Sequence, residues 1–173
     1  PAATLLELCV LVDGLPLGIE LLAAATQQRS LAQIKTELGQ SLRNIASDLV
    51  DVPERHRTLQ AVFAYSWQLL APAEQRAWRK LAIFHGPFTR RAAREVAGVS
   101  RIELDRLLDQ SLLYQAAGER YGLLAVIRQY LLEQHPWSGP ELAEAHATYF
   151  AAWLADAALT DVAGEMPNLE AMW

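Results

Sequence analysis

The chain has 173 residues, of which 52% are hydrophobic and 20% are charged, and this balance predicts a folded globular protein rather than a disordered one. The formal charge is −5 at neutral pH, and the pI is about 5.4. The chain as a whole therefore lacks the positive field that dominates binding to nucleic acids, and nucleic acid is a disfavoured partner.

Cysteine usage and hydropathy bear on the compartment. Cys9 is the single cysteine, so it cannot form an internal disulfide, and its apolar neighbours predict a small buried side chain in a reducing compartment. No apolar run approaches the roughly 18 residues of a membrane span, and the first residues do not resemble a signal peptide. We therefore expect a cytoplasmic protein without a membrane partner. The missing initial methionine and the apolar end suggest part of a longer polypeptide.

The first fifty residues predict a helical subdomain. Apolar spacing predicts helices over residues 5–12, 17–28 and 31–38. Pro16 is expected in the first turn of the second helix, because its missing N–H is not needed there. Ser30 is the expected N-cap of the third helix, and Gly39 is its expected end.

Residues 51–136 predict a winged helix. Helices are expected over residues 58–70, 71–82, 89–96 and 100–110. Thr58, Thr89 and Ser100 are the expected N-caps of three of them. A small β-hairpin over 112–123, with its turn at 117–119, should form the wing, and one more helix should run from Val126 to about His135.

Residues 137–173 predict the start of an α-helical, TPR-like repeat domain. An amphipathic helix is expected from about Pro140 to Ala158. Its inner stripe is predicted to consist of Leu142, Ala145, Tyr149 and Trp153. The predicted fold class is therefore mainly α, with a helical bundle subdomain (1–50), a winged helix with a small β-hairpin (51–136) and the start of a helical repeat region (137–173).

Three stretches resemble the STAND class of signal-transduction ATPases, which includes NB-ARC proteins and bacterial regulators with helical repeats. Residues 12–24 are similar to the GLPL segment of the ARC1-like helical subdomain. Residues 57–67 and 81–89 look like the start of the family's winged helix, and residues 107–113 with 121–130 resemble its wing and closing helix. The resemblance covers most of the chain.

The resemblance implies a role for the chain beside a nucleotide. Pro16 would pack near the adenine of ADP or ATP, with Gly14 allowing the turn before it, whereas Mg²⁺ and most of the nucleotide would be held by a preceding domain of the parent protein. An ordinary proline at the start of a helix is the alternative explanation. The chain contains no Gly-rich loop ending in Lys and Ser or Thr, so no phosphate cradle is present and we expect no enzyme activity from it alone.

Many members of this family place a histidine and an acidic residue in the winged helix, where they sense the bound diphosphate. The aligned residues here are Leu124 and Ala125, which carry no hydrogen-bonding side chain, so this sensor is missing or replaced. Arg128 matches a recurrent family arginine and is expected either at an interdomain contact or as a brace of the winged helix.

Other chemistry has little support in the sequence. His56, His85, His135 and His146 show no metal-ligand spacing among themselves or with Cys9, and each is expected in a loop or on the surface. No serine lies in a nucleophile turn, and no Cys/His pair is recognisable, so we predict no catalytic residue and no metal site.

Three functions follow as hypotheses. The first is a non-catalytic conformational switch that closes over the upstream nucleotide-binding domain, responds to the downstream repeats and permits homo-oligomerisation. The second is a DNA-binding winged helix, whose recognition helix would be residues 100–110. This helix carries two basic residues, Arg101 and Arg106, against three acidic ones, Glu103, Asp105 and Asp109, which disfavours contact with phosphates. The preceding helix carries a basic patch, Arg90, Arg91 and Arg94, which favours such contact. The third is a protein-interaction scaffold, which would not respond to nucleotide.

Overall fold

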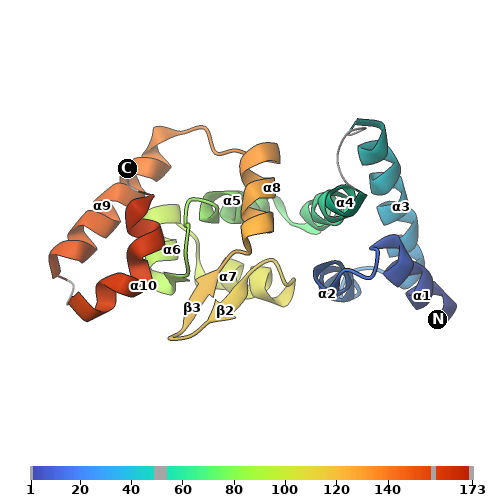
Figure 1. Cartoon of the computed structure of the whole chain (residues 1–173), viewed down its shortest axis with the longest axis horizontal. Helices are drawn as coiled ribbons and strands as arrows, with labels where there is room; N and C mark the ends of the chain where they lie inside the picture. Colours follow the sequence, from blue (N-terminus) through green and yellow to red (C-terminus); the bar gives the residue numbers. More distant parts are fainter. Residues whose placement is uncertain (1, 49–53, 157–158, 172–173) are drawn as a thin grey trace. The chain divides into compact units, whose positions relative to one another are not determined.

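The structure is a computed structural model that describes residues 2–48, 54–156 and 159–171 (Figure 1). The chain is mainly helical, as the sequence predicts, with a small three-stranded antiparallel sheet that contains the predicted β-hairpin and one further strand. It divides into two compact units, residues 1–71 and 72–173, which are described separately.

The first unit is a helical bundle. Its described helices are α1 (Ala2–Leu11), α2 (Pro16–Ala25), α3 (Leu31–Asp48) and α4 (Glu54–Leu69). Helix α4 packs along α3 and α2, and α1 packs on α3. Val12, Ile34, Leu38 and Val62 are fully buried and form the centre of its core. Burial of these apolar side chains is the main force that holds the bundle together.

Two local predictions for this unit are wrong. Gly39 does not end a helix, because α3 continues past it to Asp48. Glycine inside a helix costs about 1 kcal/mol, but packing of the neighbouring Leu38 into the core outweighs that cost. Thr58 does not cap α4, since the helix begins at Glu54; its hydroxyl donates instead to Asp13 Oδ2 at 2.8 Å.

The grouping of α4 differs from the predicted domain scheme. The sequence predicts that residues 58–70 belong to the winged helix, whereas the structure packs α4 into the first unit. The reason is its apolar stripe, which faces α2 and α3. The predicted boundary at 50/51 lies outside the described residues, and the three-domain division stays a prediction.

The second unit begins with a winged-helix-like arrangement. Its elements are α5 (Pro72–Leu81), β1 (Phe88–Thr89), α6 (Arg90–Ala97), α7 (Arg101–Asp109), β2 (Tyr114–Ala116), β3 (Arg120–Gly122) and α8 (Ala125–Gln134). The sheet order is β1-β3-β2, and Phe88 pairs with Tyr121. The hairpin β2–β3 is the predicted wing, shifted by about two residues because Leu112 and Leu113 are buried in the core instead of starting a strand. Strand β1, with two residues, is too short to show alternation in the sequence.

Two helices complete the second unit, α9 (Pro140–Asp156) and α10 (Leu159–Glu170). Helix α9 packs on α6, and α10 returns beside α9 (Figure 1). The predicted inner stripe of α9 is one position off, because Leu142, His146 and Phe150 are buried, whereas Tyr149 and Trp153 are only half-buried. Whether these helices begin a repeat array stays a prediction.

Candidate functional site

Helices α6 and α7 form a helix-turn-helix, and local sequence explains each of its boundaries. The Thr89 hydroxyl accepts from the amide of Ala92 at 3.1 Å and starts α6. Gly98 then has φ of 65°, the left-handed conformation that favours glycine at a helix end. Ser100 begins α7 through a capping box with Glu103. A turn of three residues thus joins two short helices, as in helix-turn-helix motifs.

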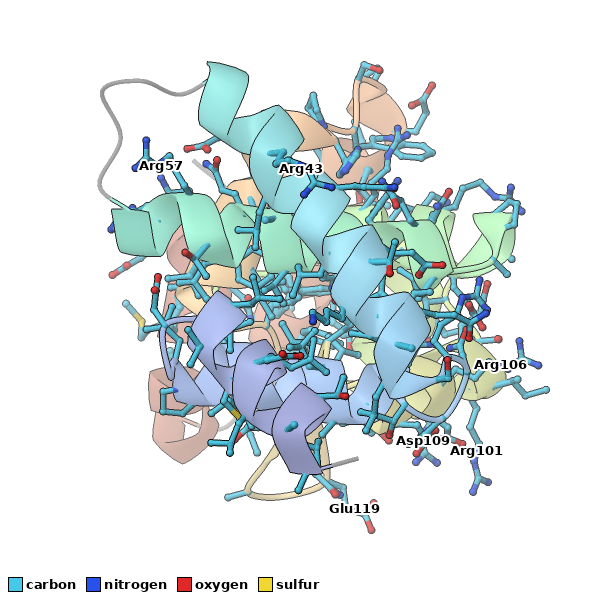
Figure 2. The ribbon with its side chains drawn as sticks, turned by 90° about the vertical axis from the view of Figure 1, so that its right-hand side faces the viewer. Arg43, Arg57, Arg101, Arg106, Asp109 and Glu119 are labelled. Atoms are coloured by element: carbon cyan, nitrogen blue, oxygen red, sulfur yellow. The ribbon has the colours of Figure 1, made fainter. Side chains whose placement is uncertain are left out.

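Packing decides which side of α7 faces solvent. Leu104 and Leu107 are fully buried, and α7 packs on α5. Arg101 and Arg106 lie on the opposite side together with Ile102, which is 67% exposed. Figure 2 shows Arg101, Arg106 and Asp109 projecting outward from α7. The helix therefore presents two arginines and one exposed aliphatic residue, which is the side that a recognition helix would turn to DNA.

Five arginines on these two helices form what we call the arginine surface: Arg90, Arg91, Arg94, Arg101 and Arg106. The exposed fractions of the last four side chains are 73%, 74%, 71% and 60%. Residues 72–136 carry ten Arg and Lys against seven Asp and Glu, although the whole chain is negative. The net charge of the chain therefore conceals a basic winged helix.

Most of these arginines contact acidic groups. Arg91 pairs with Glu95 at 2.9 Å and Arg101 pairs with Asp105 at 3.3 Å, both on exposed positions one helical turn apart. Exposed pairs of this kind contribute roughly 0.3–0.5 kcal/mol, so a phosphate can displace the carboxylate.

Arg106 and Arg90 are held more firmly than the other arginines of this surface. The Arg106 guanidinium contacts Glu74, whose side chain is buried, at 2.8 Å, which makes this pair harder to exchange. Arg90 donates to the hydroxyl of Tyr121 on β3 at 2.8 Å, and this hydrogen bond raises the pKa of Arg90. Both arginines therefore keep their charge in a fixed position.

Pro16 and Gly14, the two residues that the resemblance places beside a nucleotide, lie in the first unit. Helix α2 begins at Pro16, as predicted. Gly14 has φ of 63°, and Asp13 before it also has positive φ, so the chain reverses sharply between α1 and α2. Pro16 is exposed, and Leu15 offers no side-chain cap. A place beside adenine stays a prediction for Pro16 and Gly14.

The predicted sensor residues lie at the start of α8. Leu124 is the N-cap residue, makes no side-chain cap hydrogen bond and is exposed, as is Ala125. Arg128 donates from Nε to the carbonyl of Ala82 at 2.9 Å, and its Nη2 contacts His85. Arg128 therefore ties α8 to the end of α5 as a brace within the winged helix, and its interdomain contact stays a prediction. Burial, and then Arg128, lower the pKa of His85.

A buried polar cluster, which the sequence does not reveal, joins α10 to the winged helix. Asn168 is 0% exposed, and its Oδ1 accepts from the amides of His85 and Gly86 at 3.0 and 2.9 Å. Its Nδ2 donates to the Pro87 carbonyl at 3.2 Å and to Glu165 at 2.9 Å. We call this group the Asn168 clasp. One residue thus satisfies three backbone groups of a loop eighty positions away.

The Asn168 clasp also reaches the wing. Glu165, which is buried, pairs with Arg120 of β3 at 2.5 Å, and Arg120 also contacts the carbonyl of Pro87. A buried carboxylate is stable only with such partners. No sequence signal distinguishes Asn168 from a surface polar residue, because all its partners except Glu165 are distant in the chain.

One histidine departs from its predicted surface position. His146 is 1% exposed and packs between Phe84 and Phe150, with ring centroids at 5.7 and 4.7 Å. Burial, and then the nearby His85, lower its pKa to about 4. His56 and His85 are exposed, as predicted.

The described residues offer neither a metal-binding cluster nor a membrane-spanning helix. In the part of the chain that the structure describes, no group of three or more His, Cys, Asp and Glu is placed to hold a metal ion. Across residues 2–48, 54–156 and 159–171, none of the helices has the length and apolar character needed to span a membrane. Cys9 is half-buried rather than fully buried, which corrects its predicted position.

Comparison with known proteins gives partial matches. No family model and no solved structure matches the chain. It is 35% identical over 158 residues to a protein of Mycobacterium tuberculosis provisionally named HTH-type transcriptional regulator, a match that covers 86% of this chain and 18% of that protein. A second protein of that organism, named uncharacterized, is 31% identical over 150 residues, covering 80% of this chain and 38% of that protein. The chain thus spans about a fifth of the first relative and under two fifths of the second.

Proposed function

We propose that this chain is the winged-helix regulatory segment of a larger transcriptional regulator, and that its arginine surface contacts DNA. One observation carries the proposal: a segment similar to a protein named for a helix-turn-helix folds into a helix-turn-helix with five arginines on its outer side. The net charge of the whole chain argues against DNA binding. The basic residues are concentrated in residues 72–136, however, and their position in the winged helix favours it.

The geometry suggests how contact would be made. In helix-turn-helix proteins the second helix enters the major groove and its N-terminal residues meet base edges, while the first helix crosses the backbone. Arg101 and Ile102 occupy the first two positions of α7. Arginine is suited to guanine or phosphate, and an aliphatic side chain to the thymine methyl group. Arg91 and Arg94 on α6 would then face phosphates.

Acidic side chains set a limit on affinity. Asp105 and Asp109 share α7 with Arg101, and Glu119 lies at the exposed tip of the wing (Figure 2). Carboxylates near phosphates oppose binding, so we expect the isolated chain to bind DNA weakly and with strong dependence on salt. Each arginine that neutralises a phosphate adds roughly 0.9 to the slope of log K against log salt.

The test is fluorescence anisotropy of a labelled duplex over a salt series. We expect the double substitution Arg94→Gln with Arg101→Gln to weaken binding and to reduce the salt slope by about 2. Arg43→Gln is the matched control, since it removes one exposed positive charge from α3 in the first unit. Absence of binding at low salt, or an equal loss with Arg43→Gln, would contradict the proposal.

A second function, a nucleotide-dependent switch of the STAND type, is favoured by the turn before α2. Gly14 in the left-handed conformation and an exposed Pro16 at the start of α2 match the GLPL resemblance. In this hypothesis the chain itself is not catalytic, and an upstream domain of the parent protein binds ADP or ATP with Mg²⁺. The chain changes conformation in response to the downstream repeats and thereby permits oligomerisation. Such a switch requires a ligand that binds its two states with different affinity.

Nucleotide binding by the full-length protein that carries this chain tests the switch. We expect Pro16→Ala to weaken ADP binding several-fold, because the packing of one proline ring against adenine contributes on the order of 1 kcal/mol. Pro72→Ala, at the first position of α5, is the control. If the protein ignores nucleotide, or both variants behave alike, the switch is contradicted while the DNA proposal stands.

A further inference from the structure

A pocket of about 140 Å³ lies where α5, α8 and the beginning of α9 meet. Its walls are mostly apolar and come from the turn after α5, from α8 and from α9: Ala82, Ile83, Leu131, Leu132, Leu142 and Ala143. The connection from α8 to α9 closes one side through Trp137 and Gly139. The site lies on a different part of the second unit from the arginine surface of α6 and α7.

Two cations lie against the Trp137 ring. The guanidinium carbon of Arg79 is 5.0 Å from the ring centroid and the ammonium nitrogen of Lys80 is 4.9 Å from it. These cation–π contacts stabilise the position of the indole. The pocket therefore carries positive charge on an otherwise apolar surface.

Arg79 and Trp137 each carry a buried hydrogen-bond donor that has no acceptor among the described residues. The Nε of Arg79 and the Nε1 of Trp137 are buried, and neither has a partner among the described residues. A buried donor without a partner destabilises the folded chain, so a ligand that supplies acceptors to both donors is favoured. Both donors come from residues that line the pocket.

Other titratable groups at this site leave the positive charge in place. His135 lines the pocket, and burial followed by the Arg79 charge lower its pKa, so its ring is neutral at pH 7. Glu141 is the acidic group at the rim; a Cβ on Gly139 would lie 2.0 Å from its Oε2 and 3.1 Å from Trp137 Nε1. Its side chain is exposed. Glycine at 139 therefore leaves room for the Glu141 carboxylate, close to the indole N–H.

We propose that this pocket binds a small organic anion, namely a carboxylate on an apolar body about the size of a benzene ring. A cavity of roughly 150 Å³ accommodates benzene, which matches the apolar part of this pocket. The carboxylate would accept hydrogen bonds from Arg79 and Trp137. Since Trp137 lies in the segment that joins α8 to α9, such a ligand would act as an effector by fixing that junction.

Benzoate is the probe, and benzyl alcohol is its uncharged match. Binding is measured by titrating each compound into the chain and monitoring the indole N–H resonance of Trp137 and the heat released. We expect benzoate to bind about tenfold tighter than benzyl alcohol, because an Arg–carboxylate hydrogen bond contributes at least that factor. Trp137→Phe assigns the resonance and should itself weaken benzoate binding several-fold, since it keeps an aromatic ring but removes the donor.

Two arginine variants separate the pocket from general charge. Arg79→Gln should weaken benzoate binding about tenfold and leave benzyl alcohol almost unchanged. Arg76→Gln removes an equal charge from an exposed position of the same helix and should have no effect. Equal binding of the two probes, or no saturation with benzoate up to about 10 mM, would overturn the proposal. If Arg79→Gln fails to fold, Trp137→Phe decides. None of these outcomes depends on DNA or nucleotide binding.

Discussion

Asn168→Ala is expected to lower the free energy of unfolding of the second unit by about 3 kcal/mol. The side chain is fully buried and holds the amides of His85 and Gly86 together with the carbonyl of Pro87. Alanine removes these hydrogen bonds at once and leaves the part-buried amides of His85 and Gly86 without their acceptor, at roughly 1–3 kcal/mol each, whereas the Pro87 carbonyl keeps its contact with Arg120. Chemical denaturation measures the loss, and hydrogen exchange at His85 and Gly86 should become faster.

Two further variants make this prediction specific. Met166→Ala changes an exposed residue of the same helix and should stay within about 0.5 kcal/mol of the parent. Asn168→Asp keeps the acceptor for the two amides but places a second carboxylate beside Glu165, so it should also destabilise the unit. If exchange at His85 and Gly86 does not change in Asn168→Ala, these amides are not protected by the clasp.

The Asn168 clasp explains why the last helix belongs to the same compact unit as the winged helix. Glu165 and Asn168 bind each other on α10, and through Arg120 and the loop 85–87 they reach β3 and the entry to β1. A buried network of this kind is stabilising only while every member keeps its partner. The position of α10 and the geometry of the wing are therefore set by the same group of contacts.

Much of the local structure could be predicted from sequence because its signals are local. Pro16 at the start of α2 and the caps at Ser30, Thr89 and Ser100 depend on residues within a few positions. The predicted helix end at Gly39 is wrong for the opposite reason. The low helix propensity of glycine costs less free energy than the packing of α3 against α4 provides.

The contacts that define the candidate sites are long-range, and composition does not reveal them. Arg79 meets Trp137 across 58 positions, and Asn168 meets Gly86 across 82. The sequence does contain the excess of basic over acidic residues in 72–136. The negative net charge of the whole chain hides this excess when charge is counted over all residues together. The sequence predicts His146 on the surface because a histidine between alanines carries no signal of burial until the inner stripe of α9 is known.

Acidification is expected to destabilise the second unit through His146. Its pKa in the folded chain is about 4, against 6.5 for an unfolded histidine, because burial and then the charge of His85 disfavour the imidazolium. Between these values the unfolded state binds more protons, so this contribution to stability is fully present above pH 6.5 and is lost as the pH falls towards 4. From pH 7 to 4.5 the loss is about 2 to 3 kcal/mol.

Comparison of variants isolates this effect from the carboxylates that titrate in the same range. His146→Phe places a ring of similar size between Phe84 and Phe150 and cannot take up a proton, so its unfolding free energy should fall about 2 to 3 kcal/mol less over the interval than that of the parent chain. His56→Gln, at an exposed position, should reproduce the parent profile. Parallel profiles for the parent and His146→Phe would mean that the imidazole is already hydrated or charged in the folded state.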